Sequence, residues 1–333
     1  MVRYRAERGD RGKPGAQSGP RASGRPLDRA VREQFTLSWD RARSAIHTGK
    51  VRVDGSVVTD PTFNVREGAA LEYLPNAPRP HVKERQFIED TAILYEDHAV
   101  VVVNKPAGIS TVPFGDEDPN AARKTLDALL REILAKRSKF SGNAAGRAPL
   151  GIVHRLDKDT SGVMVFTRTL EAKKYLAQQF REHTVDRTYA AIAHGIMTRD
   201  LDLKSYFIEN RGDGLRGSAK GTTKAGQLAI THVRPLERMG KATLIECKLE
   251  TGRTHQIRIH LSEAGHPIVG ERVYIREFLA RGQTSPVRAP RMLLHAKELG
   301  FEHPTTGERV HFSAELPDDF ASVLAELRGA RAT

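Results

Sequence analysis

The 333-residue sequence has only one cysteine, Cys247. A single cysteine excludes an intramolecular disulfide and a multi-cysteine zinc site, and it is typical of proteins in a reducing cytosol. The chain also lacks an apolar run near the roughly 18 residues that a membrane-spanning helix needs, so we expect a soluble protein without a membrane partner. Residues 1–8 are charged and contain no apolar segment of a secretory signal. We therefore expect a cytoplasmic location.

Signals for nucleotides, redox cofactors and metals are also missing. There is no Walker loop, and no Gly-x-Gly-x-x-Gly motif follows a strand pattern. The 13 histidines form no cluster with cysteine or paired carboxylates. His255 and His260 lie five residues apart, a spacing that places the pair on one face of neither a helix nor a strand. We predict that the protein needs no cofactor and binds no metal.

Acidic residues are fewer than basic ones, 41 against 53, which gives a formal net charge of +12. Such an excess favours a polyanionic partner, because contacts from Lys and Arg to phosphates supply most non-specific affinity for nucleic acid. Charge alone leaves open a basic enzyme that does not bind RNA. An acidic lipid surface is a weaker alternative, because no basic amphipathic helix is evident.

The length exceeds the usual single-domain size of about 100 to 200 residues, so we expect two domains with flexible segments. Residues 1–26 carry seven basic and two acidic side chains with almost no aliphatics, which predicts a disordered basic tail. Such a tail either adds salt-sensitive RNA affinity or merely solubilises the chain. Residues 75–89 are expected to be a linker before the larger domain, residues 90–328.

Residues 27–74 are predicted to fold as a small domain. Their pattern indicates two helices, the second capped by Ser38, followed by a hairpin that turns at Asp54-Gly55. This order resembles the alpha-L RNA-binding domain of a ribosomal small-subunit protein and several RNA-modifying enzymes. The resemblance implies RNA binding by a basic cluster of Arg41, Arg43, Lys50 and Arg52. Acidic residues balance these charges along the segment, so a purely structural domain stays an alternative.

Hydrophobic patterning in the larger domain predicts a succession of strands and helices. We expect sheet segments at residues 92–95, 100–103, 163–167, 187–193, 242–249, 293–296, 300–301 and 310–312. Helices are expected at residues 121–136, 170–182, 254–264 and 321–327. Residues 202–227 are expected to form an exposed loop or an RNA-facing hairpin, and residues 275–290 a loop.

Residues 151–162, Gly-Ile-Val-His-Arg-Leu-Asp-Lys-Asp-Thr-Ser-Gly, place an acid, bases and glycines between two apolar runs. From composition alone they form a polar turn. The complete string, however, resembles the active-site motif of the pseudouridine synthases that modify large ribosomal RNA and some transfer RNAs. Three further stretches resemble motifs of this family: the Asn-Lys-Pro-Ala-Gly loop of residues 104–108, Arg187 with Tyr189, where Lys is commoner at the first position, and residues 252–258.

This resemblance spans most of residues 90–325 and implies an α+β fold with a mixed, mainly antiparallel sheet. Pseudouridine formation breaks the N1–C1′ bond of uridine, rotates the base and joins C5 to C1′, without net oxidation. The resemblance assigns the catalytic carboxylate to Asp157 and its ion-pair partner to Arg258. Tyr189 would stack on uracil and relay the C5 proton. Asp159 is interpreted as a loop residue.

The target uridine must leave the RNA stack, and the resemblance assigns the filling of the gap to Arg155. An ion pair of Arg155 with Asp157 or Asp159 is the alternative. His154 and Arg253 are further candidate RNA-binding residues. Whether Asp157 attacks the sugar or abstracts a proton stays open.

We expect a monomeric enzyme that acts on structured RNA. Ribosomal RNA of the large subunit is favoured, and transfer RNA is the alternative. A non-catalytic RNA-binding protein and a nucleoside hydrolase, which would release free base, are the competing functions. A glycosidase would need two carboxylates across the bond, and the motif offers one.

Overall fold

The computed structural model describes residues 24–77, 88–113, 125–140, 150–219, 226–283, 287 and 289–329. They form two compact units, a smaller one of residues 24–77 with Gly212–Gly214 and a larger one with the rest. Most of the predicted tail and linker lie outside the described residues. Within the predicted tail, however, Gly24–Pro26 forms strand β1, so the expectation of disorder is wrong there, because β1 pairs with β4.

The smaller unit contains two helices and five short strands. Besides β1, its elements are α1 (Leu27–Phe35), α2 (Trp39–His47), β2 (Val51–Val53), β3 (Ser56–Val57), β4 (Asn64–Arg66) and β5 (Leu71–Tyr73). The Ser38 hydroxyl accepts the Arg41 N–H, which confirms the predicted helix cap. Asp54 and Gly55 both have positive φ angles, which confirms the predicted turn between β2 and β3.

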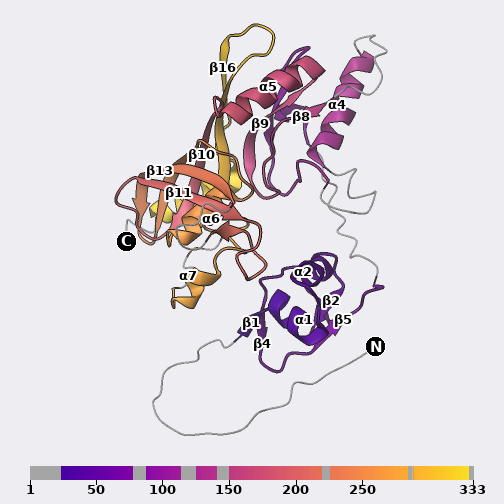
Figure 1. The fold of residues 1–333 in the computed structure, drawn as a ribbon, viewed down its shortest axis with the longest axis vertical. Helices are drawn as coiled ribbons and strands as arrows, with labels where there is room; N and C mark the ends of the chain where they lie inside the picture. The colour runs from indigo at the N-terminus through magenta and orange to yellow at the C-terminus, as the bar shows by residue number, and fades with distance from the viewer. Residues whose placement is uncertain are drawn as a thin grey trace. The chain divides into compact units, whose positions relative to one another are not determined.

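The larger unit contains a sheet of eleven strands flanked by helices (Figure 1). The strands are β6 (Ile93–Glu96), β7 (Val100–Lys105), β8 (Gly151–Ile152), β9 (Ser161–Thr167), β10 (Asp186–His194), β11 (Leu201–Ile208), β12 (Gly217–Ser218), β13 (Gln227–Met239), β14 (Ala242–Leu249), β15 (Leu294–Glu302) and β16 (Arg309–Ser313). The helices are η1 (Asp90–Ala92), α4 (Leu126–Phe140), α5 (Leu170–Glu182), α6 (Gln256–Glu263), α7 (Arg276–Ala280) and α8 (Asp318–Gly329).

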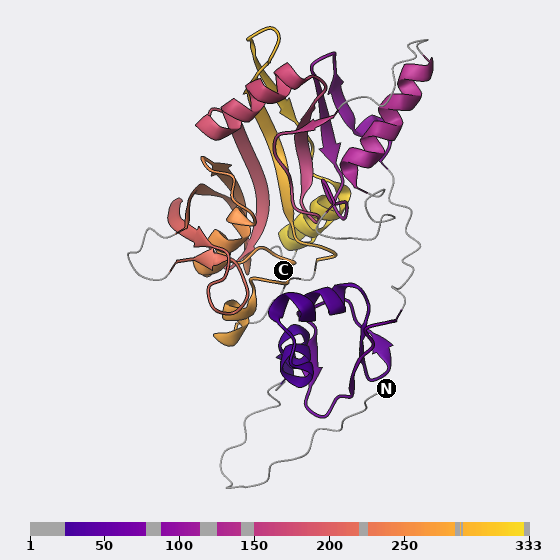
Figure 2. The same ribbon diagram turned by 45° about the vertical axis from the view of Figure 1, so that its right-hand side comes forward.

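The strand order is β12-β11-β13-β14-β10-β15-β9-β7-β6, with β16 beside β15 and β8 beside β9. Only β15 and β9 pair in parallel, and the other described pairs of this sheet are antiparallel. Helix α5 contacts β8, β9 and β15, whereas α6 contacts β13 (Figures 1 and 2). The predicted α+β class with a mainly antiparallel mixed sheet is confirmed.

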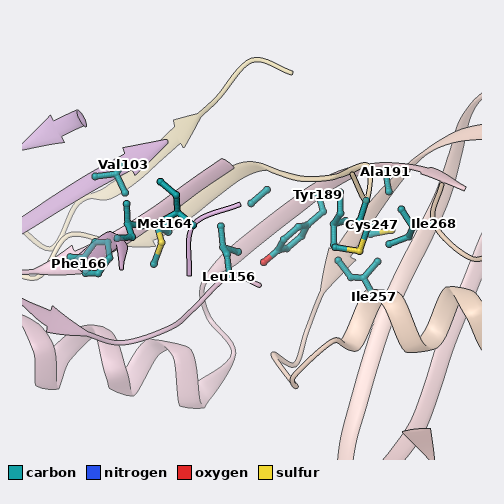
Figure 3. Close-up of a cluster of buried hydrophobic side chains, with 14 of the residues drawn as sticks. Val103, Leu156, Met164, Phe166, Tyr189, Ala191, Cys247, Ile257 and Ile268 are labelled. Carbon is teal, nitrogen blue, oxygen red and sulfur yellow. The ribbon is translucent and has the colours of Figure 1, made fainter. Parts of the chain in front are cut away.

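A continuous apolar core joins the two halves of the sheet. Figure 3 shows Val103, Met164 and Phe166 at one end of this core and Cys247 and Ile268 at the other. All seven residues of β9 are buried, as expected for a strand inside a sheet covered on both faces. At the start of β9, a Cβ on Gly162 would lie 2.1 Å from the Ala296 carbonyl oxygen, so only glycine allows this close parallel pairing.

Several expected elements differ from the observed ones. Residues 202–208 belong to strand β11, which pairs antiparallel with β12 and with β13, so of the two expectations for residues 202–227 the hairpin holds for this part and the loop does not. The loop expected at residues 275–290 contains the short helix α7. Helix α4 begins at Leu126 and extends to Phe140, whereas residues 121–124 of the predicted helix lie outside the described residues. Within the described ranges, no helix combines the length and apolar character required to cross a membrane.

Candidate active site

Asp157 lies in the loop between β8 and β9, and this loop is anchored by several buried polar groups. The Thr111 hydroxyl donates to the Leu156 carbonyl at 2.9 Å and accepts the Leu156 N–H at 3.2 Å. The Asp157 carbonyl accepts the Thr160 N–H at 3.1 Å, which closes a tight turn. These contacts fix the backbone on both sides of the Asp157 side chain.

Lys105, at the end of β7, is hydrogen-bonded to the backbone of the same loop. Its side chain is fully buried, and its Nζ donates to the carbonyls of Pro106, Lys158 and Thr160 at 3.0, 2.9 and 2.7 Å. Burial lowers the pKa of Lys105 to about 7, against the opposing effect of nearby carboxylates. The Lys105 side chain therefore joins the Asn-Lys-Pro-Ala-Gly stretch to the Asp157 loop.

Arg258 on α6 reaches Asp157 across 101 residues of sequence. Its Nη1 donates to the Asp157 Oδ2 at 3.2 Å. The Asp157 side chain keeps 20% of its surface exposed and the Arg258 side chain 11%, so the pair is partly shielded from water. The predicted proximity of the two motifs is thus observed in the structure.

Glu271, immediately after Gly270, completes the ion-pair arrangement and was missed by the sequence reasoning. Its fully buried side chain accepts Arg258 Nε on Oε2 at 2.7 Å and Arg258 Nη2 on Oε1 at 2.9 Å. Oε1 also accepts the N–H groups of Val273 and Tyr274 at 2.7 and 3.3 Å. Arg258 therefore lies between two carboxylates, one buried and one partly exposed.

His255 lies beside the other oxygen of Asp157 and is held there by Tyr274. His255 Nε2 lies 3.9 Å from Asp157 Oδ1, and its Nδ1 is hydrogen-bonded to the Tyr274 hydroxyl at 2.7 Å. Burial lowers the pKa of His255 to about 4, so the ring is neutral near pH 7. The position of His255 depends on a left-handed backbone conformation, φ 58°, at the start of α6.

The charge state of Asp157 follows from these surroundings. Burial opposes its ionised form, but the positive groups facing it, His255, Arg258 and Arg155, and the Arg258 hydrogen bond hold the pKa of Asp157 below its ordinary value of 3.8. Because His255 is neutral near pH 7, Arg258 is the close cation under those conditions. Asp157 is therefore a carboxylate at neutral pH.

Tyr189 on β10 is buried beneath the Asp157 loop. Figure 3 shows its hydroxyl directed toward Leu156, the residue before Asp157. Burial raises the pKa of Tyr189 to about 12. The phenol therefore remains protonated at neutral pH and can donate or relay a proton.

The other predicted RNA-binding residues near the loop differ in their contacts. Arg155 is exposed and makes neither a hydrogen bond nor an ion pair with any described residue, so the alternative pairing with Asp157 or Asp159 is not formed. Arg253 Nε donates to the Leu228 carbonyl at 2.9 Å. His154 Nε2 accepts the Val165 N–H at 3.1 Å, and its ring stacks on Phe180.

Arg187, the first residue of the motif around Tyr189, is buried. Its Nη2 donates to the Glu250 carbonyl at 2.7 Å, and its guanidinium lies 5.7 Å from the centre of the Phe180 ring. These contacts attach the end of β14 to β10. They favour a supporting role for Arg187.

In the smaller unit, Arg41 and Arg52 are exposed and Lys50 is half-buried. Arg43 differs, because its Nε lies 3.1 Å from the carboxylate of Asp28, which is fully buried. Over the described parts of both units, no three His, Cys, Asp or Glu side chains gather in a group suited to a metal ion.

Comparisons of the sequence with known proteins point to one family. Residues 99–263 match the family model described as RNA pseudouridylate synthase. The chain is 37% identical over 300 residues to the ribosomal large subunit pseudouridine synthase D of Zymomonas mobilis, covering 88% of this chain and 90% of that protein. It is 35% identical over 312 residues to the protein of the same name from Pseudomonas aeruginosa, covering 92% of each.

A solved structure supports the same assignment. The human RNA pseudouridylate synthase domain containing 4 aligns with a TM-score of 0.52 and 25% identity, over 72% of this chain and 93% of that one. The matched family region contains Asp157, Tyr189 and Arg258. The chain therefore belongs to the RNA pseudouridylate synthase family.

Proposed function

We propose that this protein converts uridine to pseudouridine in large-subunit ribosomal RNA, with Asp157 as the catalytic carboxylate. The observation that carries the proposal is the 3.2 Å contact between Arg258 Nη1 and Asp157 Oδ2, which holds an ionised carboxylate at a partly exposed position. The names of the two bacterial relatives support the choice of RNA.

The reaction requires few groups. The N1–C1′ bond breaks, the uracil turns, C5 bonds to C1′, and the proton lost from C5 is balanced by one gained at N1. Asp157 supplies the single carboxylate, either by attacking the sugar or by accepting a proton from it. Tyr189, whose buried phenol stays protonated at neutral pH, is proposed to contact the base and relay the C5 proton.

Arg155 is proposed to take the place of the extruded uridine. Its side chain is exposed beside Asp157 and makes no ion pair within the described residues, so its planar guanidinium is available to stack on bases. Arg253 is proposed to bind RNA on the same unit. RNA binding by His154 stays a prediction, and its contacts with Val165 and Phe180 favour support of the loop.

Residues 27–74 are proposed to form an alpha-L RNA-binding domain, and residues 90–328 the catalytic domain. The exposure of Arg41 and Arg52 supports phosphate binding by this domain, with Lys50 beside them in sequence. The ion pair of Arg43 with buried Asp28 favours a role for Arg43 in stability. We also propose a cytoplasmic monomer, which sedimentation and cell fractionation would test.

Tritium release from RNA labelled at uracil C5 tests the reaction. The wild-type protein should release tritium from large-subunit ribosomal RNA, because C5 loses its hydrogen when it bonds to C1′. Asp157→Ala should lower the rate on the order of 10⁴-fold. Asp159→Asn, a change of an exposed side chain in the same loop, is the matched control and should retain activity.

Other results would separate the alternatives. Tritium release from transfer RNA but not ribosomal RNA would contradict the proposed substrate. Liberation of free uracil would indicate a hydrolase. RNA binding without release from either RNA would support a binding protein.

A further inference from the structure

Glu271 has more contacts with Arg258 than Asp157 has. The guanidinium of Arg258 has three nitrogens, and Glu271 accepts from two of them, Nε at 2.7 Å and Nη2 at 2.9 Å. Asp157 receives the third, Nη1, at the longer distance of 3.2 Å. The side-on fork of Arg258, formed by Nε and Nη2, is therefore occupied by Glu271, and Asp157 meets the guanidinium only through Nη1.

The backbone holds Glu271 in place. The Glu271 side chain is fully buried, and its Oε1 accepts the N–H groups of Val273 and Tyr274, two and three residues further on. A buried carboxylate with four hydrogen bonds has little freedom to move. Glu271 is thus a fixed point against which the guanidinium is oriented.

The result for Asp157 is a contact with Arg258 at one oxygen only. Oδ2 accepts Arg258 Nη1, whereas Oδ1 accepts no hydrogen bond from the described residues, and His255 Nε2 lies 3.9 Å from it, beyond hydrogen-bonding distance. A carboxylate that must attack or deprotonate the sugar needs one oxygen without a strong hydrogen bond. A bidentate pair with arginine would occupy both oxygens.

We propose that Glu271 is a positioning residue that restricts Arg258 to a single contact with Asp157 and so leaves Oδ1 available to the sugar. This inference rests on the proposed function of Asp157. Glu271 itself does not contact the substrate. It acts through Arg258.

The substitution Glu271→Gln tests this role with little change of shape. The amide retains an oxygen for the backbone N–H groups, but its NH₂ faces Arg258 Nε, so two donors oppose each other. The guanidinium should then turn toward Asp157 and occupy both of its oxygens. We expect kcat to fall about 100-fold with KM within about twofold of wild type. Glu271→Asp retains the charge and should recover part of kcat.

Glu96→Gln is the matched control. Glu96 also lies between two arginines, accepting Arg137 at 2.8 Å and Arg168 at 3.1 Å, but among the described residues it has no hydrogen bond or ion pair with Asp157, Arg258 or Glu271. Its loss should leave kcat unchanged. Wild-type kcat in both Glu271→Gln and Glu271→Asp would overturn the proposed role. A rise of KM with an unchanged kcat would also overturn it.

A second readout does not depend on activity. In protein labelled with ¹⁵N-arginine, the Arg258 Nε–H signal, assigned by its loss in Arg258→Lys, should be protected from solvent exchange. Glu271→Gln should remove this protection and Glu96→Gln should not. An unchanged signal in folded Glu271→Gln would contradict the inference even if ribosomal RNA proved not to be the substrate. If Glu271→Gln does not fold, weaker Nε–H protection and lower kcat in Glu271→Asp remain the expected results, and wild-type values of both would overturn the proposal.

Discussion

Basic side chains differ in their surroundings between the active site and the smaller unit. In the larger unit Arg187 is buried and Arg258 keeps only 11% of its side chain exposed, and they are bound to a carbonyl and to carboxylates. In the smaller unit, Arg41 and Arg52 are exposed on α2 and β2. The positive charge of this chain therefore occurs in two settings. Shielded arginines are held by carboxylates and carbonyls, whereas the exposed Arg41 and Arg52 side chains are free of such contacts in the described residues and are suited to phosphates.

The largest expected effect concerns the buried pair. Arg258→Met leaves the carboxylate of Glu271 buried without its cation, and we expect unfolding to become easier by about 3 to 5 kcal/mol. The double variant Arg258→Met with Glu271→Met should recover most of this stability, because no unpaired charge remains, yet it should stay inactive. Urea unfolding followed by circular dichroism measures the free energy of unfolding.

A free energy of unfolding as low in the double variant as in Arg258→Met would contradict this expectation. That result would show that Arg258 stabilises the fold by packing alone. Activity in the double variant would show that Asp157 does not need Arg258.

Arg43 tests the comparison inside the smaller unit. Its pair with fully buried Asp28 resembles the buried pairs of the larger unit. Arg43→Ala should destabilise the smaller unit by about 3 kcal/mol, because buried Asp28 loses the hydrogen-bonded charge of Arg43. Arg41→Ala and Arg52→Ala should leave stability within about 0.5 kcal/mol.

RNA binding should depend more on the exposed Arg41 and Arg52 than on Arg43, the reverse of the order expected for stability. Arg41→Ala and Arg52→Ala should each lower the salt dependence of binding by about one unit of slope, as expected for one lost phosphate contact. Titration of binding against salt concentration measures this slope. An unchanged slope in both variants would remove the proposed role of the smaller unit.

A further expected effect concerns pH. Burial lowers the pKa of His154 to about 3, below the value of about 6.5 in an unfolded chain. The unfolded state therefore binds the proton first, so the stability contributed by neutral His154 is complete above pH 6.5 and is lost as pH falls toward 3. At pH 5 the loss should be about 2 kcal/mol.

His154→Gln should reduce this pH dependence, because the Gln carbonyl can still accept the Val165 N–H but does not titrate. Urea unfolding at pH 7 and pH 5 gives the comparison. An unchanged dependence, together with weaker RNA binding, would favour the predicted contact of His154 with RNA.

The sequence was most informative where local signals decide the structure. Helix α5 has the predicted bounds of residues 170–182, because Thr169 caps it and its apolar side chains share one face. Asp157 and Arg258 were identified from the motif resemblance, which also predicted that they pair. Hydrophobic periodicity alone would have identified neither residue.

Other features depend on distant contacts and were not predictable. Glu271 is a lone acid after a glycine, and its role arises only when α6 places Arg258 beside it. For residues 202–227 the sequence left a loop and a hairpin open, whereas pairing of β11 with β12 and β13 determines the conformation. Such pairings are set by the tertiary structure and leave little local pattern.

The most direct test of the account is to map pseudouridine in unmodified transcripts of large-subunit ribosomal RNA and of transfer RNA. Each transcript is incubated with wild-type protein or Asp157→Ala, treated with a carbodiimide that marks pseudouridine, and read by primer extension. The account predicts a stop in the ribosomal transcript with wild-type protein and none with Asp157→Ala. A stop with both proteins, or one confined to transfer RNA, would contradict it.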